Sequence, residues 1–314
     1  MGRKKKGNPV HGWLVLDKPT GVTSTQMVGR ARRLLNAQKA GHGGTLDPLA
    51  TGILPLAFGE ATKTVSYAMD GRKTYAFSVQ WGQETDSCDS DGQITQESDH
   101  RPDEEAIRAV LPEFLGPIQQ IPPRFSALKV DGKRAYDLAR SNQEFELEAR
   151  RVEIFRLELL SVDGPDQATF EVDCGKGTYV RSLARDIAGK LGTLGHIVML
   201  RRLRVGPFGL EHAISLESLD AMGHSPAAGE ELHQQLLPIR AALDDISVLA
   251  LSETEAADLR FGRKVVLDHT RARELAEDLS GRSDQTILAE EGVTPVALCQ
   301  LDDLILSPVR VLNL

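Results

Sequence analysis

The sequence predicts an α+β fold, in which one large domain has a mostly antiparallel central sheet flanked by helices and a small β-rich module follows. Residues 74–82, 151–162 and 168–174 alternate apolar and polar side chains with the two-residue period of half-buried strands. Helical stretches do not alternate regularly with these strands, as they would in a doubly wound parallel sheet. The chain changes character near residue 245, where short β-prone runs begin.

The N-terminal part combines a strand, a helix and a glycine-rich loop. Residues 12–16 are an apolar run in front of a Pro-Thr-Gly turn, which is typical of a short buried strand. Ser24 or Thr25 is placed to cap a helix that runs to about Leu35. Residues 40–52 contain too many glycines for regular structure, so we expect a loop there.

Residues 84–105 hold nine acids and one base, and we expect a solvated loop that leads into a helix over 103–114. The stretch 89–92 reads Asp-Ser-Asp-Gly, as a calcium-binding loop does. However, Ser87 and Ser98 stand where such a loop needs its first ligand and its bidentate glutamate. The sequence therefore predicts no metal site.

The second half of the large domain begins with an insertion. Residues 117–150 mix proline, arginine and lysine around a helical patch at 135–140, which is typical of an inserted surface segment. Further along we expect a hairpin of 151–162 and 168–174, an amphipathic helix after Thr178, a strand at 197–205 and an irregular polar connection at 222–232. The C-terminal module is expected to contain a helix near 252–261 and strands at 285–289, 294–300 and 308–313.

The formal net charge of −8 hides an uneven distribution of charge. Residues 1–40 carry nine lysines and arginines and one aspartate, whereas residues 241–314 hold seven basic and fourteen acidic residues. A basic segment on an acidic body indicates a surface that faces a polyanion, because steering depends on the local field. We expect residues 1–10 to form a disordered basic arm, and the run Arg3 to Lys6 taken alone could equally have no role in binding.

The composition also bears on the compartment. No run of about 18 uncharged apolar residues occurs, and no apolar stretch follows the basic N-terminus as in a signal peptide. The three cysteines are widely spaced, which argues against a disulfide framework and a thiolate zinc site. A cytoplasmic protein without a membrane partner is therefore predicted.

Asp47 is the first candidate for chemistry, because familiar catalytic signatures such as a nucleophile elbow or a Walker A loop are absent. Three glycines and His42 precede it, so the backbone can turn tightly and approach a ligand closely. A carboxylate on such a loop can act as a nucleophile or as a base. The Asp47-Pro48 pair is also typical of a helix N-cap, and both readings stay open on these residues alone.

Arg181 is the second candidate, at the start of a predicted helix whose apolar face excludes it. It is either an ordinary surface arginine or an ion-pair partner that keeps a buried aspartate ionised and oriented. Tyr75 and Tyr179 are two of only four tyrosines. Such side chains either belong to the core or stack on an unpaired base. His42 could equally be a loop histidine with a structural hydrogen bond.

Seven sequence blocks then form one pattern within about residues 10–210. They are Leu16–Gly21, Gly41–Lys63, Lys73–Tyr75, Gly82–Asp86, Gln120–Lys129, Gly175–Arg181 and Leu200–Leu203. In this order they closely resemble the motifs of the bacterial tRNA pseudouridine synthase B family, the TruB family. The C-terminal region is only weakly similar and sits where that family carries a PUA-like RNA-binding module.

The resemblance implies a pseudouridine-synthase catalytic domain over residues 11–240, with an RNA-clamping insertion at 117–150, and a PUA-like domain at 245–314. It implies isomerisation of the uridine at position 55 in the TΨC loop of tRNA to pseudouridine, by base flipping and aspartate nucleophilic catalysis. Neither a cofactor nor a metal is implied. The implied partner is the TΨC stem-loop of tRNA, bound by a monomer without an obligatory protein partner. The insertion would bind phosphates through Arg124, Lys129, Lys133 and Arg134.

The resemblance also assigns roles to individual residues. Asp47 would be the nucleophile, Arg181 would pair with it, and Tyr75 would stack on the flipped uracil and take part in proton transfer. The uridine pocket would be lined by His42, Tyr179 and Leu200, with Lys63 supporting the same loop or a phosphate. Whether the aspartate attacks the ribose C1′ or the base C6, or assists a glycal route, stays open.

Three other functions are open to a chain with these residues. A relative that acts within a guide-RNA complex would carry partner-binding extensions, for which a chain of 314 residues has little room. A catalytically silent RNA-binding protein would lack Asp47 or Arg181. A hydrolase using Asp47 would need a partner acid or a metal cluster, which the sequence does not show. A tRNA-folding chaperone role beside catalysis stays open.

Overall fold

The computed structural model describes residues 7–314 except 127, 131, 142, 225–227 and 283. The large sheet contains β1 (Gly12–Lys18), β2 (Ala40–His42), β3 (Thr51–Phe58), β4 (Lys73–Trp81), β7 (Gly116–Gln120), β10 (Arg150–Val162), β11 (Gln167–Cys174), β12 (Gly195–Val205), β13 (Phe208–Gly209) and β14 (Ala213–Ser215). Around it lie α1 (Ser24–Leu34), α2 (Val65–Asp70), α3 (Glu104–Val110), α4 (Ala135–Arg140), α5 (Val180–Lys190), α6 (Leu216–Gly223) and α7 (Ala228–Gln234). Short 3₁₀ turns are η1 (Gly59–Lys63), η2 (Leu111–Phe114), η3 (Leu210–His212) and η4 (Ile239–Ala242), and two small hairpins are β5 (Gln83–Thr85) with β6 (Ile94–Glu97) and β8 (Lys129–Val130) with β9 (Lys133–Arg134).

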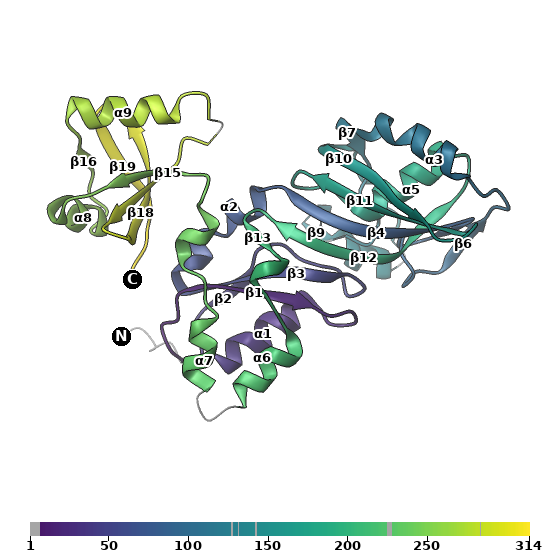
Figure 1. Ribbon diagram of the computed structural model, residues 1–314, viewed down its shortest axis with the longest axis horizontal. Helices are drawn as coiled ribbons and strands as arrows, with labels where there is room; N and C mark the ends of the chain where they lie inside the picture. The colour runs from purple at the N-terminus through teal and green to yellow at the C-terminus, as the bar shows by residue number, and fades with distance from the viewer. Residues whose placement is uncertain (1–6, 127, 131, 142, 225–227, 283) are drawn as a thin grey trace.

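The 10-stranded sheet has the order β14-β1-β3-β12-β4-β11-β10-β7, with β2 beside β3 and β13 beside β12. In the described part of the chain, its parallel pairs are β1 with β14 and β3 with β12, and the other pairs are antiparallel. The predicted α+β fold with a mostly antiparallel sheet is therefore confirmed. Figure 1 shows α1, α6 and α7 gathered at one end of the sheet and α3 and α5 at the other.

The central strands are buried on both faces, which explains why β1 is a continuous apolar run rather than an alternating one. Leu14 and Leu16 pack into a core shared with α1, α3 and α5. Trp13 and Val15, which point to the opposite face, belong to a second core. Strand β1 thus holds the two layers of the domain together.

The C-terminal module is a five-stranded sheet that packs on this second core. It consists of β15 (Ser247–Ala250), β16 (Val265–Val266), β17 (Ile287–Glu291), β18 (Thr294–Asp302) and β19 (Ile305–Val311), with α8 (Glu253–Arg260) and α9 (His269–Leu279). Leu288, Leu298 and Leu312 lie in the same buried cluster as Trp13 and Val15. The module, at the yellow end of the chain in Figure 1, is therefore docked through apolar contacts.

Two sequence predictions about the N-terminal part are wrong in detail. Thr23, not Ser24 or Thr25, caps α1, and it does so in a capping box with Gln26. Residues 7–10 of the predicted disordered arm are part of the fold, since Asn8 pairs with Ala37 and Val10 is buried. The basic residues Arg3 to Lys6 lie outside the described residues.

Two predicted irregular segments contain regular structure. The described residues of 222–232 belong mostly to α6 and α7, because Leu219 and Leu232 are buried in the main core. The segment 84–105 contains the β5–β6 hairpin and a partly buried turn. The longest described helices, α1, α5 and α9, have 11 residues, so none in the described part can span a bilayer.

Candidate active site

A cavity of about 580 Å³ opens between β4, β12, the start of α5 and the loops 43–50 and 86–93. Its volume suits a ligand the size of a nucleotide. Phe125, Tyr136 and Arg140 of the 117–150 segment line one side of it. Five of the predicted site residues line the same cavity: Asp47, Tyr75, Tyr179, Arg181 and Leu200.

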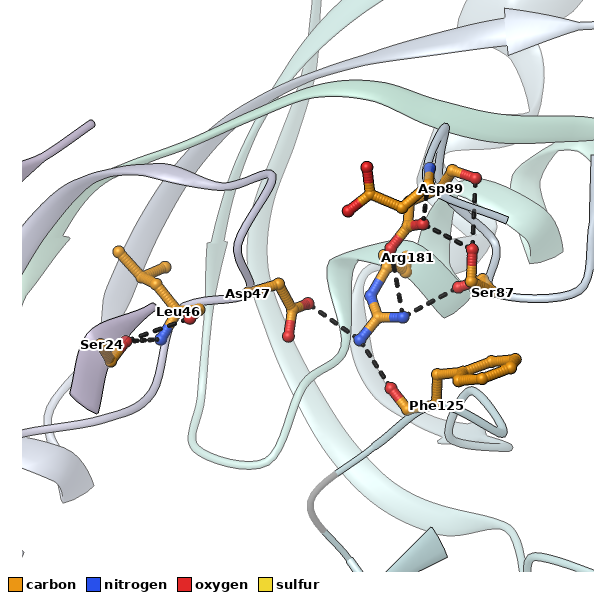
Figure 2. A network of polar contacts seen from close by, with 8 residues as sticks. Ser24, Leu46, Asp47, Ser87, Asp89, Phe125 and Arg181 are labelled. Carbon is orange, nitrogen blue, oxygen red and sulfur yellow. Dashed lines mark hydrogen bonds and ion pairs between the residues drawn. The ribbon is translucent and has the colours of Figure 1, made fainter. Parts of the chain in front are cut away.

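Arg181 is the centre of the polar network at this cavity (Figure 2). It lies in the first turn of α5 and is only 5% exposed. Its Nη2 is 2.8 Å from Asp47 Oδ2, and its Nη1 is 3.3 Å from Asp89 Oδ2. The same two nitrogens donate to the carbonyl oxygens of Phe125 at 2.9 Å and Ser87 at 2.8 Å. Four acceptors from three loops therefore hold one guanidinium in place.

Asp47 lies in the 43–50 loop, and no helix follows it. The next element is the strand β3, so the N-cap reading is wrong. Ser24 fastens the loop, because its hydroxyl donates to the Leu46 carbonyl at 3.0 Å and accepts from the Leu46 N–H at 2.9 Å. The Asp47 side chain is 40% exposed, so the carboxylate reaches the cavity while its backbone is fixed.

Lys18 also supports the loop that carries Asp47. Its side chain is fully buried, and its Nζ donates to the carbonyl oxygens of Pro19 at 2.8 Å, Val22 at 2.7 Å and Pro48 at 3.2 Å. Burial lowers the pKa of Lys18 to about 8, although the nearby Asp47 carboxylate acts in the opposite direction. A buried ammonium group thus holds the backbone next to Asp47.

Asp89 is held by a turn that is fastened to β12. The Ser90 N–H donates to the Ile197 carbonyl at 2.9 Å, and the Ile197 N–H donates to Cys88 at 3.1 Å. Cys88 has a φ of 60°, a left-handed conformation that is rare for residues with a side chain. The turn directs the Ser87 hydroxyl onto Asp89, whose pKa is raised by burial.

Aromatic and aliphatic side chains form the rest of the cavity wall. Tyr75 on β4 is 8% exposed, and burial raises its pKa. Tyr179 precedes α5, where its N–H donates to Gln120 Oε1 at 2.8 Å, and burial raises its pKa as well. Leu200 comes from β12, next to β4 in the sheet. These side chains give an aromatic and aliphatic surface against which a base can pack.

Two predicted site residues do not line the cavity. His42 is half-buried at the end of β2, and burial followed by the charge of Arg202 lowers its pKa. The prediction for Lys63 is not supported by its position, because it belongs to the contact with the C-terminal module. Its Nζ donates to the Val311 carbonyl at 2.7 Å and pairs with Glu60 at 2.5 Å.

Sequence reasoning missed three residues that build the site: Lys18, Asp89 and Arg202, whose Nη2 donates to the Gly44 carbonyl ahead of Asp47 at 3.1 Å. Lys18 and Arg202 stand inside sequence blocks already identified, but nothing local shows that their side chains are buried. Asp89 lies three residues after such a block, in a stretch whose many acids indicated solvation. Among the described residues, no cluster of three His, Cys, Asp or Glu side chains could hold a metal ion.

Comparison with known proteins shows the family of the chain. The family model described as the N-terminal domain of TruB family pseudouridylate synthase matches residues 32–180, and that of the tRNA pseudouridylate synthase B C-terminal domain matches 181–244. The chain is 50% identical over 314 residues to the tRNA pseudouridine synthase B of Caulobacter vibrioides, with both chains covered completely. The chain belongs to the TruB family. The enzyme of the same name from Rhodospirillum rubrum is also 50% identical, again over 100% of both chains.

Solved structures show the TruB fold over the whole chain. The archaeal box H/ACA sRNP Nop10-Cbf5 complex contains a chain that is 24% identical, with a TM-score of 0.72 and coverage of 100% of this chain and 93% of that one. An H/ACA RNP bound to a substrate RNA containing 2′-deoxyuridine gives 22% identity, the same TM-score and coverage of 100% and 92%. The pseudouridine-synthase fold predicted from the sequence is confirmed.

Proposed function

We propose that the chain is a tRNA pseudouridine synthase that isomerises the uridine at position 55 in the TΨC loop of tRNA. Asp47 is the nucleophile, and the uridine reaches it by flipping out of the RNA stack. The observation that carries the proposal is the Asp47–Arg181 ion pair at the edge of a nucleotide-sized cavity. Full-length identity of 50% to proteins named for this activity supports the choice of tRNA.

The geometry of Asp47 suits nucleophilic attack. Arg181 holds Oδ2, whereas no hydrogen bond to Oδ1 is found in the described part of the chain. One oxygen is therefore anchored and the other can face a bound nucleotide, which is the pre-organisation that covalent catalysis needs. The geometry favours none of the three routes, through C1′, through C6 or through a glycal.

The buried charges favour the bond cleavage. Lys18 and Arg181 are at most 5% exposed; Arg181 pairs with Asp47 and Asp89, and the charge of Lys18 interacts with that of Asp47. When the glycosidic C–N bond breaks, negative charge develops on the uracil. Fixed cations in a water-poor site stabilise such charge more than water does.

The 117–150 segment is proposed to clamp the RNA. It places Phe125, Tyr136 and Arg140 on the cavity wall, and the Arg140 guanidinium lies 4.4 Å from the centre of the Tyr136 ring. Lys129 and Lys133 are exposed on the β8–β9 hairpin, where phosphates can reach them. Neutralising both lysines is expected to weaken tRNA binding and to flatten its dependence on salt concentration. Unchanged affinity and salt dependence would contradict the clamp.

The remaining assignments are proposals of the same kind. His42, outside the cavity, would contact the RNA loop around the flipped nucleotide. Residues 11–240 would form the catalytic domain, and residues 245–314 a PUA-like domain whose acidic surface contributes little to RNA binding. The protein would act in the cytoplasm as a monomer, without a cofactor, a metal or a guide RNA.

The test uses the purified protein and an unmodified tRNA transcript, with no guide RNA and no cofactor. We expect pseudouridine at position 55 alone, and no product from a transcript with cytidine at that position. The isolated TΨC stem-loop should also be a substrate. Conversion at another position would contradict the assignment of the uridine. Binding of tRNA without any conversion would instead favour an RNA-binding or RNA-folding protein.

A further inference from the structure

The N-terminus of α5 lies at the cavity with backbone N–H groups that have no acceptor. The first four N–H groups at the start of a helix lack partners within it, and in α5 they belong to residues 179–182. The Tyr179 N–H donates to Gln120, but the Tyr179 side chain does not cap the helix. In the described part of the chain, the N–H groups of residues 180–182 find no acceptor. Three donors are thus left over at one edge of the cavity.

These donors are buried, so bulk water does not readily take the place of the missing acceptor. Val180 and Arg181 are each 5% exposed and line the cavity, and Ser182 behind them is fully buried. A buried N–H group without a partner costs free energy, and most such groups in proteins are paired. The helix dipole adds positive charge at the same place. The start of α5 therefore has the chemistry of an anion site.

The Ser126 hydroxyl is a second unpaired group at this cavity. Ser126 is 4% exposed and lines the cavity, and its hydroxyl has no hydrogen-bond partner among the described residues. Its backbone is fixed, because the Phe125 carbonyl accepts from Arg181 at 2.9 Å and the Ser126 carbonyl accepts from the Tyr136 N–H at 3.0 Å. The hydroxyl lies close to Tyr179, where it acts against the burial that raises the pKa of that tyrosine. It is therefore beside the start of α5 and can donate to an anion there.

The charges around the cavity favour one orientation of a nucleotide. The turn over 86–93 contributes the carboxylates of Asp86 and Asp91 to the lining. The segment that contains Ser126 instead contributes Arg140, which is exposed and forms no ion pair in the described chain. A phosphate is repelled by the acidic turn and attracted by the start of α5 and by Arg140.

We propose that the N-terminus of α5 and the Ser126 hydroxyl together bind a backbone phosphate of the flipped nucleotide. The inference rests on the proposed function and adds a contact to the same substrate. A phosphodiester carries one negative charge, and its two free oxygens only accept hydrogen bonds, which suits a site made of three N–H groups and a hydroxyl. This phosphate sets the direction of the RNA strand across the cavity and holds the ribose near Asp47.

The first arm of the experiment measures the Kd of the TΨC stem-loop with proteins that all carry Asp47→Asn, so that conversion does not follow binding. Val180→Pro removes one of the three N–H groups. Proline is favoured at the first position of a helix, and the extended backbone of Tyr179 suits a residue that precedes proline. Val180→Ala loses apolar contacts but keeps the N–H, so it is the matched control. We expect a Kd about tenfold higher for Val180→Pro than for Val180→Ala, as is usual for a hydrogen bond to a charged group.

The second arm changes the RNA. Each phosphate next to the target uridine is replaced in turn by an uncharged methylphosphonate, and the adjoining 2′-hydroxyl is replaced by hydrogen both in this RNA and in its charged reference. At one of the two positions the Kd should rise about tenfold, and Val180→Pro should then add little. Ser126→Ala should raise the Kd of the charged RNA about 3- to 10-fold and should also add little with the uncharged one. Ser141→Ala is the control on the same segment, since its hydroxyl already donates to the Asp137 carbonyl.

Equal Kd values for Val180→Pro and Val180→Ala would overturn the inference, and so would losses that multiply with both uncharged RNAs. Normal binding by Val180→Pro together with slower conversion, once Asp47 is restored, would also overturn it, because the N–H groups would then act on the uracil. Thermal unfolding checks each variant, and if Val180→Pro does not fold, Ser126→Ala decides by the same comparison. Failure of the wild-type protein to bind or convert tRNA would instead contradict the proposed function, which separates the two claims.

Discussion

Asp47 and Asp89 are two aspartates on one arginine, yet their surroundings differ sharply. Asp47 is held by a loop fastened through Ser24, and its side chain is 40% exposed at the cavity. Asp89 is held by a turn fastened to β12, and its side chain is 6% exposed. The Asp47 carboxylate is open to the cavity, whereas the Asp89 carboxylate is engaged by Arg181, the Ser87 hydroxyl and the Asp91 N–H. The surroundings therefore favour different roles for two residues of the same type.

Removing Arg181 should affect both aspartates at once and have the largest effect. Arg181→Met leaves the Asp89 carboxylate buried without its partner, which should cost about 3 kcal/mol of unfolding free energy. Pseudouridine formation should fall below detection, because Asp47 loses its only described anchor. Urea unfolding and a conversion assay measure the two effects.

Arg185→Met is the control for this substitution, since Arg185 lies one turn further along α5 and pairs with its neighbour Asp186. It should lose less than about 1 kcal/mol, as is usual for a partly exposed ion pair. Equal losses in the two variants would show that the Arg181 network has no special weight.

Replacing Asp89 tests the buried aspartate alone. Asp89→Asn keeps the shape of the side chain but weakens the hold on Arg181, so we expect a loss of about 100-fold in kcat with little change in KM. Asp91→Asn, in the same turn but without contact to Arg181, should keep near-normal activity. A normal kcat for Asp89→Asn would show that Arg181 needs only Asp47 and the two carbonyl groups.

The fastening of the Asp47 loop can be tested separately. Ser24→Ala removes both contacts to Leu46 and leaves a backbone N–H unpaired in a buried place, which should cost about 1–2 kcal/mol of stability. Activity should fall by about tenfold, because the loop is less well positioned. Thr25→Ala, on the exposed side of α1, should change neither quantity.

The last expected effect is confined to alkaline pH, where the stability of the protein should depend on the titration of Lys18. Its pKa is about 8 in the folded protein against an ordinary value of 10.5, so the unfolded chain binds more protons between these values. The penalty for a charged buried amine is complete below pH 8 and is relieved as the pH rises. The unfolding free energy of the wild type should therefore gain about 2 kcal/mol relative to Lys18→Met between pH 8 and 10. The exposed Lys39→Met should show no such difference, and a flat profile for Lys18 would contradict its burial as a cation.

The framework of the site could be predicted from local pattern. Period-two alternation identified β4, and the apolar face of α5 placed Arg181 at a helix start. The glycines ahead of Asp47 predict a loop over 40–52, of which residues 43–50 form the loop and the two ends belong to β2 and β3. These features depend on neighbours in the chain, so a single sequence is enough to read them.

The parts that were missed depend on contacts between distant segments. Asp89 is buried only because its turn pairs with Ile197, more than 100 residues later in the chain. Ser24 was expected to cap a helix, but its hydroxyl is used by Leu46, in the loop after β2. The block that contains Lys63 predicts a role at the substrate, whereas its amine donates to Val311 of the C-terminal module. In each case, contacts with a segment far away in the sequence set the position of the residue.

The most direct test of the account compares Asp47→Asn with the wild type in single-turnover conversion of an unmodified tRNA transcript. Asp99→Asn serves as the control, since Asp99 is exposed and lies away from the cavity. We expect Asp47→Asn to bind tRNA but to lose at least about 10⁴-fold in rate, as is usual when a nucleophile is removed. Conversion by Asp47→Asn at a rate near that of the wild type would contradict it.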